Sequence, residues 1–310
     1  MLRKTIELAS PGSRLSVKNA QLRVQRKDAR EVNIPIEDIG VLIVDDRQAV
    51  YTQSVFIDLL EAGGMVLVTN RNHLPAGMML PIEGHHEQTK RQNAQLSLSK
   101  PRKKGLWKTL IKTKIRLQAD MLEQHILSDA GLRRLAERVR SGDPDNYEAQ
   151  AAQRYWPRLF GSEFRRNRDK PGVNGLLNYG YSVMRAGIAR ALVGSGLLPS
   201  QGVFHRNRRN AFCLADDMLE PYRPLVDWQV RRILNADVNV EPSLEVRAHR
   251  ATILALFNRT IMFTGSKLPV LIAMERTARS LVSCCEMKES DLELPESLPL
   301  ELQDVETEGE

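Results

Sequence analysis

Cysteine and long apolar runs are both scarce in this 310-residue chain. It has three cysteines, Cys213, Cys284 and Cys285, and the last two are sequence neighbours that seldom bridge each other. This odd number argues against a disulfide framework and favours a reduced, cytoplasmic protein. Arg185 and Arg190 interrupt the most apolar helical candidate, and no run reaches the roughly 18 apolar residues of a membrane helix. The basic start lacks the unbroken apolar stretch of a signal peptide, so we expect a cytoplasmic protein without membrane contact.

The usual catalytic motifs are missing as well. The sequence contains no GxxxxGK followed by Ser or Thr, no GxGxxG, no GxSxG and no CxxC pair. Their absence removes the common cues for nucleotide, dinucleotide, acyl-transfer and zinc chemistry. Carboxylates, histidines and basic residues are left as the candidates for chemistry.

Basic residues outnumber acidic residues outside the C-terminal segment. The chain carries a formal charge of +7, while residues 288–310 hold nine acidic side chains and one lysine, a net charge of −8. Residues 1–287 therefore carry +15. Such an excess suggests a polyanionic partner, because Lys and Arg release counterions when they contact phosphates. Charge alone leaves open a solvated basic surface without a partner.

The sequence pattern predicts an α+β fold in three parts. Residues 1–83 form a β-rich domain, because short alternating or β-branched runs are split by turn-forming residues around one helix over 50–64. Residues 84–287 have apolar residues at three- and four-residue spacing and predict a larger, all-helical domain. Residues 288–310 alternate acids with Leu and Pro, and we expect this tail to be disordered.

Residues 202–227 combine one histidine, several arginines and a cluster of carboxylates. Asp217 and Glu220 are three positions apart, so on a helix their carboxylates crowd onto one surface and repel unless a cation lies among them. Together with His205 they make a donor set that suits Mg²⁺ or Mn²⁺. A further ligand could come from Glu148, although a glutamate in the first turn of a helix also complements the helix dipole.

Two basic stretches are candidates for contacts to DNA phosphates. Three arginines closely follow His205, with a surface basic loop as the alternative: Arg206, Arg208 and Arg209. In the run KPRKKGLWKTLIKTKIR, three lysines recur every four residues and line one helical face: Lys104, Lys108 and Lys112. Few acidic residues accompany this run, which favours a phosphate-binding face over a merely solvated one.

A polar strip interrupts the apolar segment NGLLNYGYSVMR. Asn178, Tyr181 and Arg185 recur at spacings of three and four and therefore share one face of the predicted helix. They either face the functional site or are satisfied polar groups in the core.

Several motifs, in order along the chain, resemble one protein family. DPDNYEAQAAQRYWPRLFG and the segment from GVNGLLNYG to PYRPLVD are similar to the core signatures of the CRISPR-associated spacer-acquisition integrase, the larger of the two universal adaptation proteins. LASPGSRLSVKNAQL, VNIPIEDIGVLIVDD and LPAGMMLPIEGHHEQ are similar to its type II branch. The resemblance covers about residues 1–287, and the acidic tail has no counterpart in it.

The resemblance implies a metal-dependent DNA integrase and endonuclease. The family's glutamate, histidine and last acidic ligand fall on Glu148, His205 and Glu220, and Asp217 matches an acidic residue that supports the site. The implied cofactor is Mg²⁺ or Mn²⁺, which acts as a Lewis acid on the scissile phosphate while a DNA 3′-hydroxyl or water attacks. Where many relatives have GFLH or GFIH, this chain has GVFH.

The implied partners are double-stranded DNA, as spacer precursor and CRISPR repeat, a second copy of the chain in a homodimer, and a small ferredoxin-like adaptation subunit. Two other functions are compatible with the residues. A non-catalytic basic scaffold would bind nucleic acid, but it has no reason to place Asp217 and Glu220 beside arginines. A nuclease acting on branched DNA outside CRISPR is the other alternative.

Overall fold

The computed structural model describes residues 3–26, 29–236, 239–287 and 290–300. Its N-terminal part contains two four-stranded sheets. The first has the strand order β1 (Lys4–Leu8), β5 (Ile39–Val44), β7 (Met65–Thr69) and β8 (Pro75–Met79), with only β8 antiparallel to its neighbour. The second has the order β4 (Ala29–Pro35), β3 (Gln21–Arg26), β2 (Arg14–Lys18) and β6 (Val50–Tyr51). Helix α1 (Gln53–Glu61) lies between β6 and β7 in the chain.

The central strand β5 of the first sheet is buried on both faces, and it joins the two parts of the molecule. Val41 and Ile43 of β5 belong to the large core of the helical part, whereas Leu42 and Val44 belong to a smaller core within the β-rich part. Successive side chains of a strand point to opposite faces, so β5 contributes to both cores. The continuous apolar run IGVLIV is typical of such a doubly covered strand.

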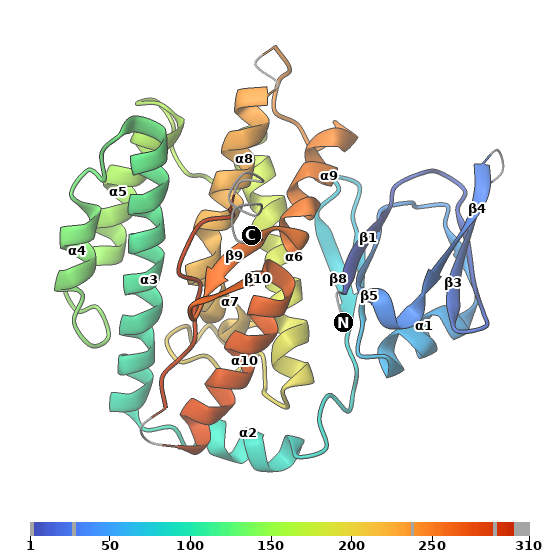
Figure 1. The fold of residues 1–310 in the computed structure, drawn as a ribbon, viewed down its shortest axis with the longest axis horizontal. Coiled ribbons are helices and arrows are strands. Elements are labelled where there is room, and N and C mark those ends of the chain that lie inside the picture. The colour runs from blue at the N-terminus through green and yellow to red at the C-terminus, as the bar shows by residue number, and fades with distance from the viewer. Residues whose placement is uncertain (1–2, 27–28, 237–238, 288–289, 301–310) are drawn as a thin grey trace, which may run out of the picture.

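Helices dominate the rest of the chain, as the periodicity predicts. They are α2 (Gln88–Leu96), α3 (Lys100–Ile126), α4 (Leu132–Arg138), α5 (Tyr147–Phe160), α6 (Val173–Gly194), α7 (Cys213–Leu219), α8 (Arg223–Ala236), α9 (Arg247–Ala255) and α10 (Val270–Glu286), with 3₁₀ turns at Ile36–Asp38 (η1), Glu220–Tyr222 (η2) and Leu256–Asn258 (η3). Helix α6 packs against α7, α8, α9 and α10. Figure 1 shows the β-rich part at one end of the molecule and α3, α4 and α5 at the other. The predicted α+β fold class is confirmed.

A two-stranded hairpin interrupts the helical part and was not predicted. Strands β9 (Thr260–Phe263) and β10 (Ser266–Pro269) pair antiparallel between η3 and α10. Each strand has only four residues and is flanked by helical periodicity, so the sequence pattern merges it with the neighbouring helices.

The expectation of a disordered tail is wrong for residues 290–300. Phe263 of β9 forms an antiparallel bridge with Pro295, and the Leu300 amide donates to the carbonyl of Thr260 over 2.8 Å. Leu292, Leu294 and Leu298 are buried in the large core. These leucines have a packing partner that the sequence pattern did not reveal, namely the hairpin. Residues 288–289 and 301–310 of the predicted tail lie outside the described residues.

The sequence predicted neither a membrane helix nor a disulfide framework. None of the helices within the described ranges is both long and apolar enough to cross a membrane. All three cysteines are unbridged, with Cys213 and Cys284 buried and Cys285 half-buried.

Candidate active site

Three separate elements bring the predicted ligands Glu148, Glu220 and His205 to one cavity of about 310 Å³. Glu148 is in the first turn of α5, Glu220 is the first residue of the 3₁₀ turn η2 after α7, and His205 is in the loop between α6 and α7. Sequence separation therefore hides their proximity, which the helical packing creates.

The start of α5 is fixed by two side chains that precede it. Asn146 adopts a left-handed conformation with φ of 53°, and its side chain accepts a hydrogen bond from the Ala149 amide. The Asp143 carboxylate accepts hydrogen bonds from the backbone amides of Tyr147 and Glu148, over 2.9 and 3.0 Å. These contacts satisfy amides that a helix start otherwise leaves unpaired, and they hold the Glu148 backbone in place.

Lys114 of α3 joins the two glutamates. Its Nζ atom lies 2.6 Å from Oε1 of Glu148 and 2.5 Å from Oε2 of Glu220. Arg223 donates from Nε to the other carboxylate oxygen of Glu220 over 2.9 Å. Although burial alone would raise it, the charges of Arg223 and Lys114 lower the pKa of Glu220 to about 2. Burial in turn lowers the pKa of Lys114, but Glu220 and Glu148 outweigh it and raise that pKa overall.

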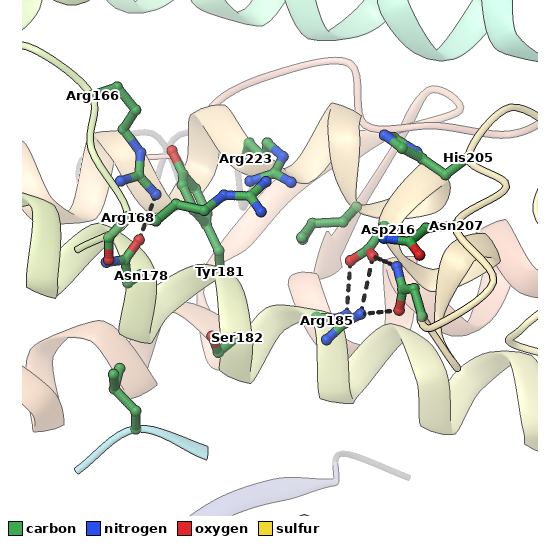
Figure 2. Close-up of a pocket in the computed structure, with 13 residues that line it drawn as sticks. Arg166, Arg168, Asn178, Tyr181, Ser182, Arg185, His205, Asn207, Asp216 and Arg223 are labelled. Atoms are coloured by element: carbon green, nitrogen blue, oxygen red, sulfur yellow. Dashed lines mark hydrogen bonds and ion pairs between the residues drawn. The ribbon is translucent and has the colours of Figure 1, made fainter. Parts of the chain in front are cut away.

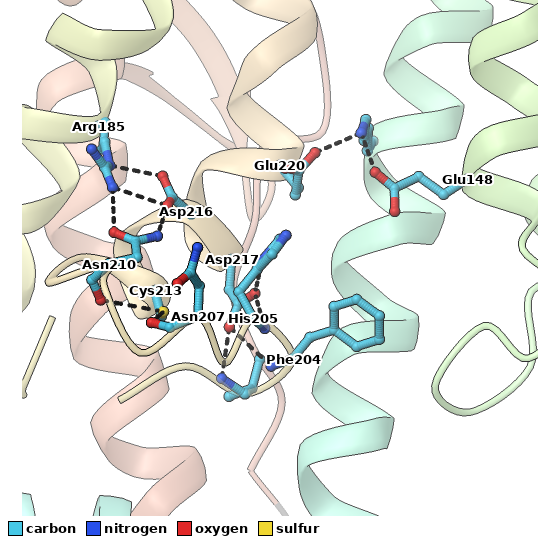
Figure 3. Close-up of polar contacts among 12 residues, drawn as sticks. Glu148, Arg185, Phe204, His205, Asn207, Asn210, Cys213, Asp216, Asp217 and Glu220 are labelled. Carbon is cyan, nitrogen blue, oxygen red and sulfur yellow. Dashed lines mark hydrogen bonds and ion pairs between the residues drawn. The ribbon is translucent and has the colours of Figure 1, made fainter. Parts of the chain in front are cut away.

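Asp217 fixes the loop that carries His205. Its fully buried carboxylate accepts hydrogen bonds from the amides of Val203, Phe204 and His205 over 2.6, 3.0 and 3.1 Å. It also lies 2.6 Å from His205 Nδ1. Figure 3 shows this contact as a dashed line. This hydrogen bond outweighs partial burial and raises the pKa of His205. Asp217 therefore contacts the histidine loop, where the resemblance implied a supporting residue, and Glu220 contacts Lys114.

Gly202 allows the loop to approach Asp217 closely. A Cβ atom at this position would lie 2.4 Å from the His205 carbonyl oxygen and 2.8 Å from Asp217 Oδ2. Only glycine avoids that overlap. The next residues are fixed by aromatic packing, since Phe204 stacks on the buried Trp107 ring at a centroid distance of 4.0 Å and the His205 ring meets Trp107 edge-on at 5.6 Å.

The donor set at this cavity fits a hard divalent ion. Glu148 and Glu220 offer carboxylate oxygens, and with Nδ1 of His205 engaged by Asp217 the Nε2 atom is the nitrogen available for a ligand. In the arrangement described, however, no three His, Cys, Asp or Glu side chains of the described residues are grouped closely enough to hold a metal. The ammonium of Lys114 lies between the two glutamates instead.

The predicted polar strip of α6 lies along a second, larger cavity of about 540 Å³ that also includes His205 (Figure 2). Arg185 forms an ion pair with Asp216 over 2.7 Å and donates to Asn210. Asn178 accepts a hydrogen bond from Arg166 over 2.7 Å. The strip residues therefore border the site and are also satisfied by neighbouring side chains.

Tyr181, the third residue of the strip, belongs to a buried network around Asp227. Both Tyr181 and Tyr155 donate their hydroxyl hydrogens to the Asp227 carboxylate. Burial raises the pKa of Asp227 to about 6, against the opposing effect of these hydrogen bonds and of Arg223. The guanidinium of Arg223 also lies over the Tyr181 ring, 4.7 Å from its centroid.

Sequence reasoning missed several residues at the site. They are Lys114, Arg166, Arg168, Arg223 and Asp227, all of which line the smaller cavity. Lys114 carried a usable signal, because it lies three and four positions from the buried Ile111 and Leu110 and so falls on the apolar face of α3. The arginines at 166 and 168 lie in a loop without periodicity, and no local pattern indicates where they point.

The predicted DNA-contacting residues are placed at the surface. Arg206, Arg208 and Arg209 are exposed in the loop after His205. On α3, Lys104 is exposed and Lys108 and Lys112 are half-buried: the predicted face is present as a row of lysines. Their contact with DNA stays a prediction.

Comparison with known proteins identifies the family. The family model for CRISPR associated protein Cas1 matches residues 6–259. The CRISPR-associated endonuclease Cas1 of Neisseria meningitidis serogroup C (strain 8013) is 36% identical over 297 residues, which cover 94% of this chain and 96% of the relative.

Solved structures at lower identity share the fold. A casposase bound to integration product has a TM-score of 0.76 at 20% identity, with 93% of this chain and 92% of the casposase covered. A Cas1 protein from Thermotoga maritima has a TM-score of 0.73 at 16% identity, with 93% and 98% covered. A chain of a Cas6-RT-Cas1–Cas2 complex has a TM-score of 0.72 at 18% identity, with 94% and 36% covered. On the family model and the match to the Neisseria relative, this chain belongs to the Cas1 family of CRISPR-associated proteins.

Proposed function

We propose that this chain is a metal-dependent DNA integrase and endonuclease of CRISPR adaptation, which inserts short duplex DNA into the CRISPR array. The observation that carries the proposal is the single cavity lined by Glu148, His205 and Glu220 together with three arginines. Two carboxylates and an imidazole suit a divalent ion, and the arginines suit the phosphates that such an ion would act on. The name of the Neisseria relative, a CRISPR-associated endonuclease, supports the same class of reaction.

The divalent ion, Mg²⁺ or Mn²⁺, would supply Lewis acidity at the scissile phosphate when bound. Glu148 and Glu220 would be its oxygen ligands, and Nε2 of His205 its nitrogen ligand. Asp217 fixes the orientation of the imidazole by accepting the hydrogen bond from Nδ1. The three amides that also donate to Asp217 make this orientation rigid.

Arginines supply the remaining charge for phosphoryl transfer. Arg166, Arg168 and Arg223 line the cavity, where their guanidinium groups can bind the non-bridging phosphate oxygens as charge develops. In integration, a DNA 3′-hydroxyl oxygen attacks phosphorus and one existing P–O3′ bond breaks, so the number of phosphodiester bonds is unchanged. In hydrolysis, water replaces the 3′-hydroxyl. Neither reaction needs a nucleophile from the protein.

The proposed partners follow the family. Double-stranded DNA would bind across the exposed Arg206, Arg208 and Arg209 and the lysine row Lys104, Lys108 and Lys112, whose positive charge suits its phosphates. A homodimer and a small ferredoxin-like adaptation subunit would complete a cytoplasmic complex. A solved Cas6-RT-Cas1–Cas2 complex, which contains a chain of this fold, supports this kind of assembly.

The test is integration by variants of the proposed ligands. Glu148→Ala, His205→Ala and Glu220→Ala should each abolish joining of an oligonucleotide to a CRISPR-array plasmid in the presence of the partner subunit and Mg²⁺ or Mn²⁺. Glu123→Ala is the matched control, because Glu123 is a surface carboxylate of α3 paired with Arg133. Undiminished joining in all three ligand variants would exclude this function.

The same assay separates the alternatives. A basic scaffold would bind DNA in a salt-dependent way but yield no product that chelation removes. A nuclease outside CRISPR would cut branched DNA without joining an oligonucleotide to the array.

A further inference from the structure

Lys114 differs from the other lysines of α3 in where it lies. The row Lys104, Lys108 and Lys112 follows one side of the helix, and Lys114 lies about 200° around the helix axis from Lys112. Its neighbours on that side, Leu110, Ile111 and Leu117, are fully or almost fully buried, and Lys114 itself is 8% exposed. A buried ammonium is costly unless it is paired, so the two glutamates at its end account for its position.

Lys114 also reduces the repulsion between the carboxylates of Glu148 and Glu220. Glu148 and Glu220 direct carboxylate oxygens at the same ammonium, and two carboxylates so close repel each other unless a cation lies between them. Arg223 contacts the other oxygen of Glu220, Oε1, and not the oxygen that Lys114 contacts. Lys114 is therefore the cation that holds the pair together.

A divalent ion bound by both glutamates would take one carboxylate oxygen from each, and Lys114 contacts one oxygen of each. Mg²⁺ binds carboxylate oxygens at roughly 2.0–2.1 Å, so an ion that bridges these two oxygens would lie where the ammonium lies. An ammonium nitrogen 2.6 and 2.5 Å from Glu148 Oε1 and Glu220 Oε2 occupies the space between them. Ion and ammonium must therefore alternate at this position.

We propose that Lys114 is an internal competitor for the divalent metal: its ammonium holds Glu148 and Glu220 together in the metal-free protein and must leave both carboxylates when the ion binds. This inference rests on the proposed metal-dependent function. Lys114 then acts as a positioning residue that preserves the site in the absence of metal and weakens the apparent affinity for it. The cavity of about 310 Å³ that it lines together with the two glutamates leaves its flexible four-carbon side chain room to move.

The experiment measures Mn²⁺ affinity without DNA, by calorimetry or by electron paramagnetic resonance of free Mn²⁺. Lys114→Met keeps the length and apolar stem of the side chain and removes the ammonium. We expect it to bind Mn²⁺ about tenfold more tightly than the unchanged protein, because no cation has to be displaced. Lys112→Met is the matched control on the other side of α3 and should leave the affinity unchanged. Without metal, Lys114→Met should also lower the melting temperature, and saturating Mn²⁺ should raise it by more than in the unchanged protein.

The outcomes distinguish the competitor role of Lys114 from the metal-dependent function on which it rests. Equal or weaker Mn²⁺ binding by Lys114→Met, with unchanged binding by Lys112→Met, overturns the competitor role but leaves the metal-dependent function standing. No Mn²⁺ binding by either the unchanged protein or Lys114→Met overturns both. If Lys114→Met does not fold without metal, a crystal structure of the unchanged protein with Mn²⁺ is the second measurement. Lys114 released from both glutamates supports the inference, and Lys114 still joined to both beside a bound ion overturns it.

Discussion

His205 and Asp217 form a hydrogen bond of 2.6 Å between Nδ1 and Oδ1, and the same carboxylate accepts the His205 backbone amide over 3.1 Å. One side chain thus fixes both the ring and the backbone of the proposed nitrogen ligand. Asp217 therefore orients His205, whereas Glu220, three residues later in the chain, contacts Lys114 at the cavity.

Asp217→Asn should uncouple the histidine from its support. The pKa of His205 should fall toward its ordinary value, which a histidine NMR titration measures, and DNA joining should fall about tenfold or more. Because the His205 pKa is raised in the folded protein, its stabilising contribution is full below the unfolded value of about 6.5 and is lost as pH rises through the raised value. The free energy of unfolding of Asp217→Asn should lack this pH-dependent contribution from His205. Asp38→Asn is the control, since Asp38 pairs with Lys4 in the β-rich part, and this variant should retain the raised pKa of His205.

Gly202→Ala should damage the loop through steric overlap alone. The added Cβ would lie 2.4 Å from the His205 carbonyl oxygen, so the histidine must shift. We expect a loss of about 1–3 kcal/mol in the free energy of unfolding and a strong loss of joining. Gly105→Ala is the matched control, because nothing lies within 4 Å of a Cβ there and alanine favours the helix by up to about 1 kcal/mol. Equal stability of the two variants would contradict the close approach at Gly202.

Tyr181→Phe should change stability in a pH-dependent way. The Tyr181 hydroxyl donates to Asp227, whose pKa burial raises to about 6, and its removal should raise that pKa further. Because the folded pKa of this acid lies above its unfolded value, its charged form destabilises the fold as pH rises from about 4 to 6. The variant should therefore lose about 1–3 kcal/mol at pH 7 and less at pH 5, measured by denaturant unfolding.

The control for this measurement is Tyr222→Phe. Its buried hydroxyl bonds to Thr277 over 2.8 Å and not to an acid. We expect a similar loss at both pH values. A loss from Tyr181→Phe that does not differ between pH 5 and pH 7 would refute the proposed linkage to Asp227.

Leu298→Ala tests the packing of the C-terminal segment. Leu298 is 3% exposed in the large core, so the substitution should cost about 2–5 kcal/mol of unfolding free energy. Met287→Ala, at a position 56% exposed, should cost almost nothing. A neutral Leu298→Ala would restore the expectation of a disordered segment.

Arg168→Ala tests the proposed phosphate contacts. Arg168 lines both cavities, so its loss should weaken DNA binding for all sequences and reduce the slope of log affinity against log salt by about one. Arg133→Ala is the control, because Arg133 is committed to Asp120 and Glu123 on α3. An unchanged salt slope in Arg168→Ala would remove this arginine from the DNA path.

The sequence pattern predicted the fold well wherever an element was a long periodic helix or a continuous apolar strand. The six buried residues of β5 and the long α6 are examples. It failed where partners are distant in the sequence: Leu292, Leu294 and Leu298 read as an unpacked tail because their partner is a hairpin that the same pattern had concealed.

The residues of the site were predictable only in part, because some of their contacts join segments that are far apart in the sequence. The family motifs named Glu148, His205 and Glu220, and the structure places all three at one cavity. The ammonium between the glutamates was not foreseen, because Lys114 was counted as one more charge in a basic run. Its partners lie 34 and 106 residues away, beyond any local pattern.

The placement of β5 has a consequence for how the molecule loses its structure. Because Val41 and Ile43 belong to one core and Leu42 and Val44 to the other, separating the two parts would strip one face of this strand of its packing. The β-rich part excised alone would expose an apolar surface and should aggregate. We expect the two parts of the intact chain to unfold together, and a single transition in calorimetry would show that the predicted boundary at residue 83 does not separate two units of folding.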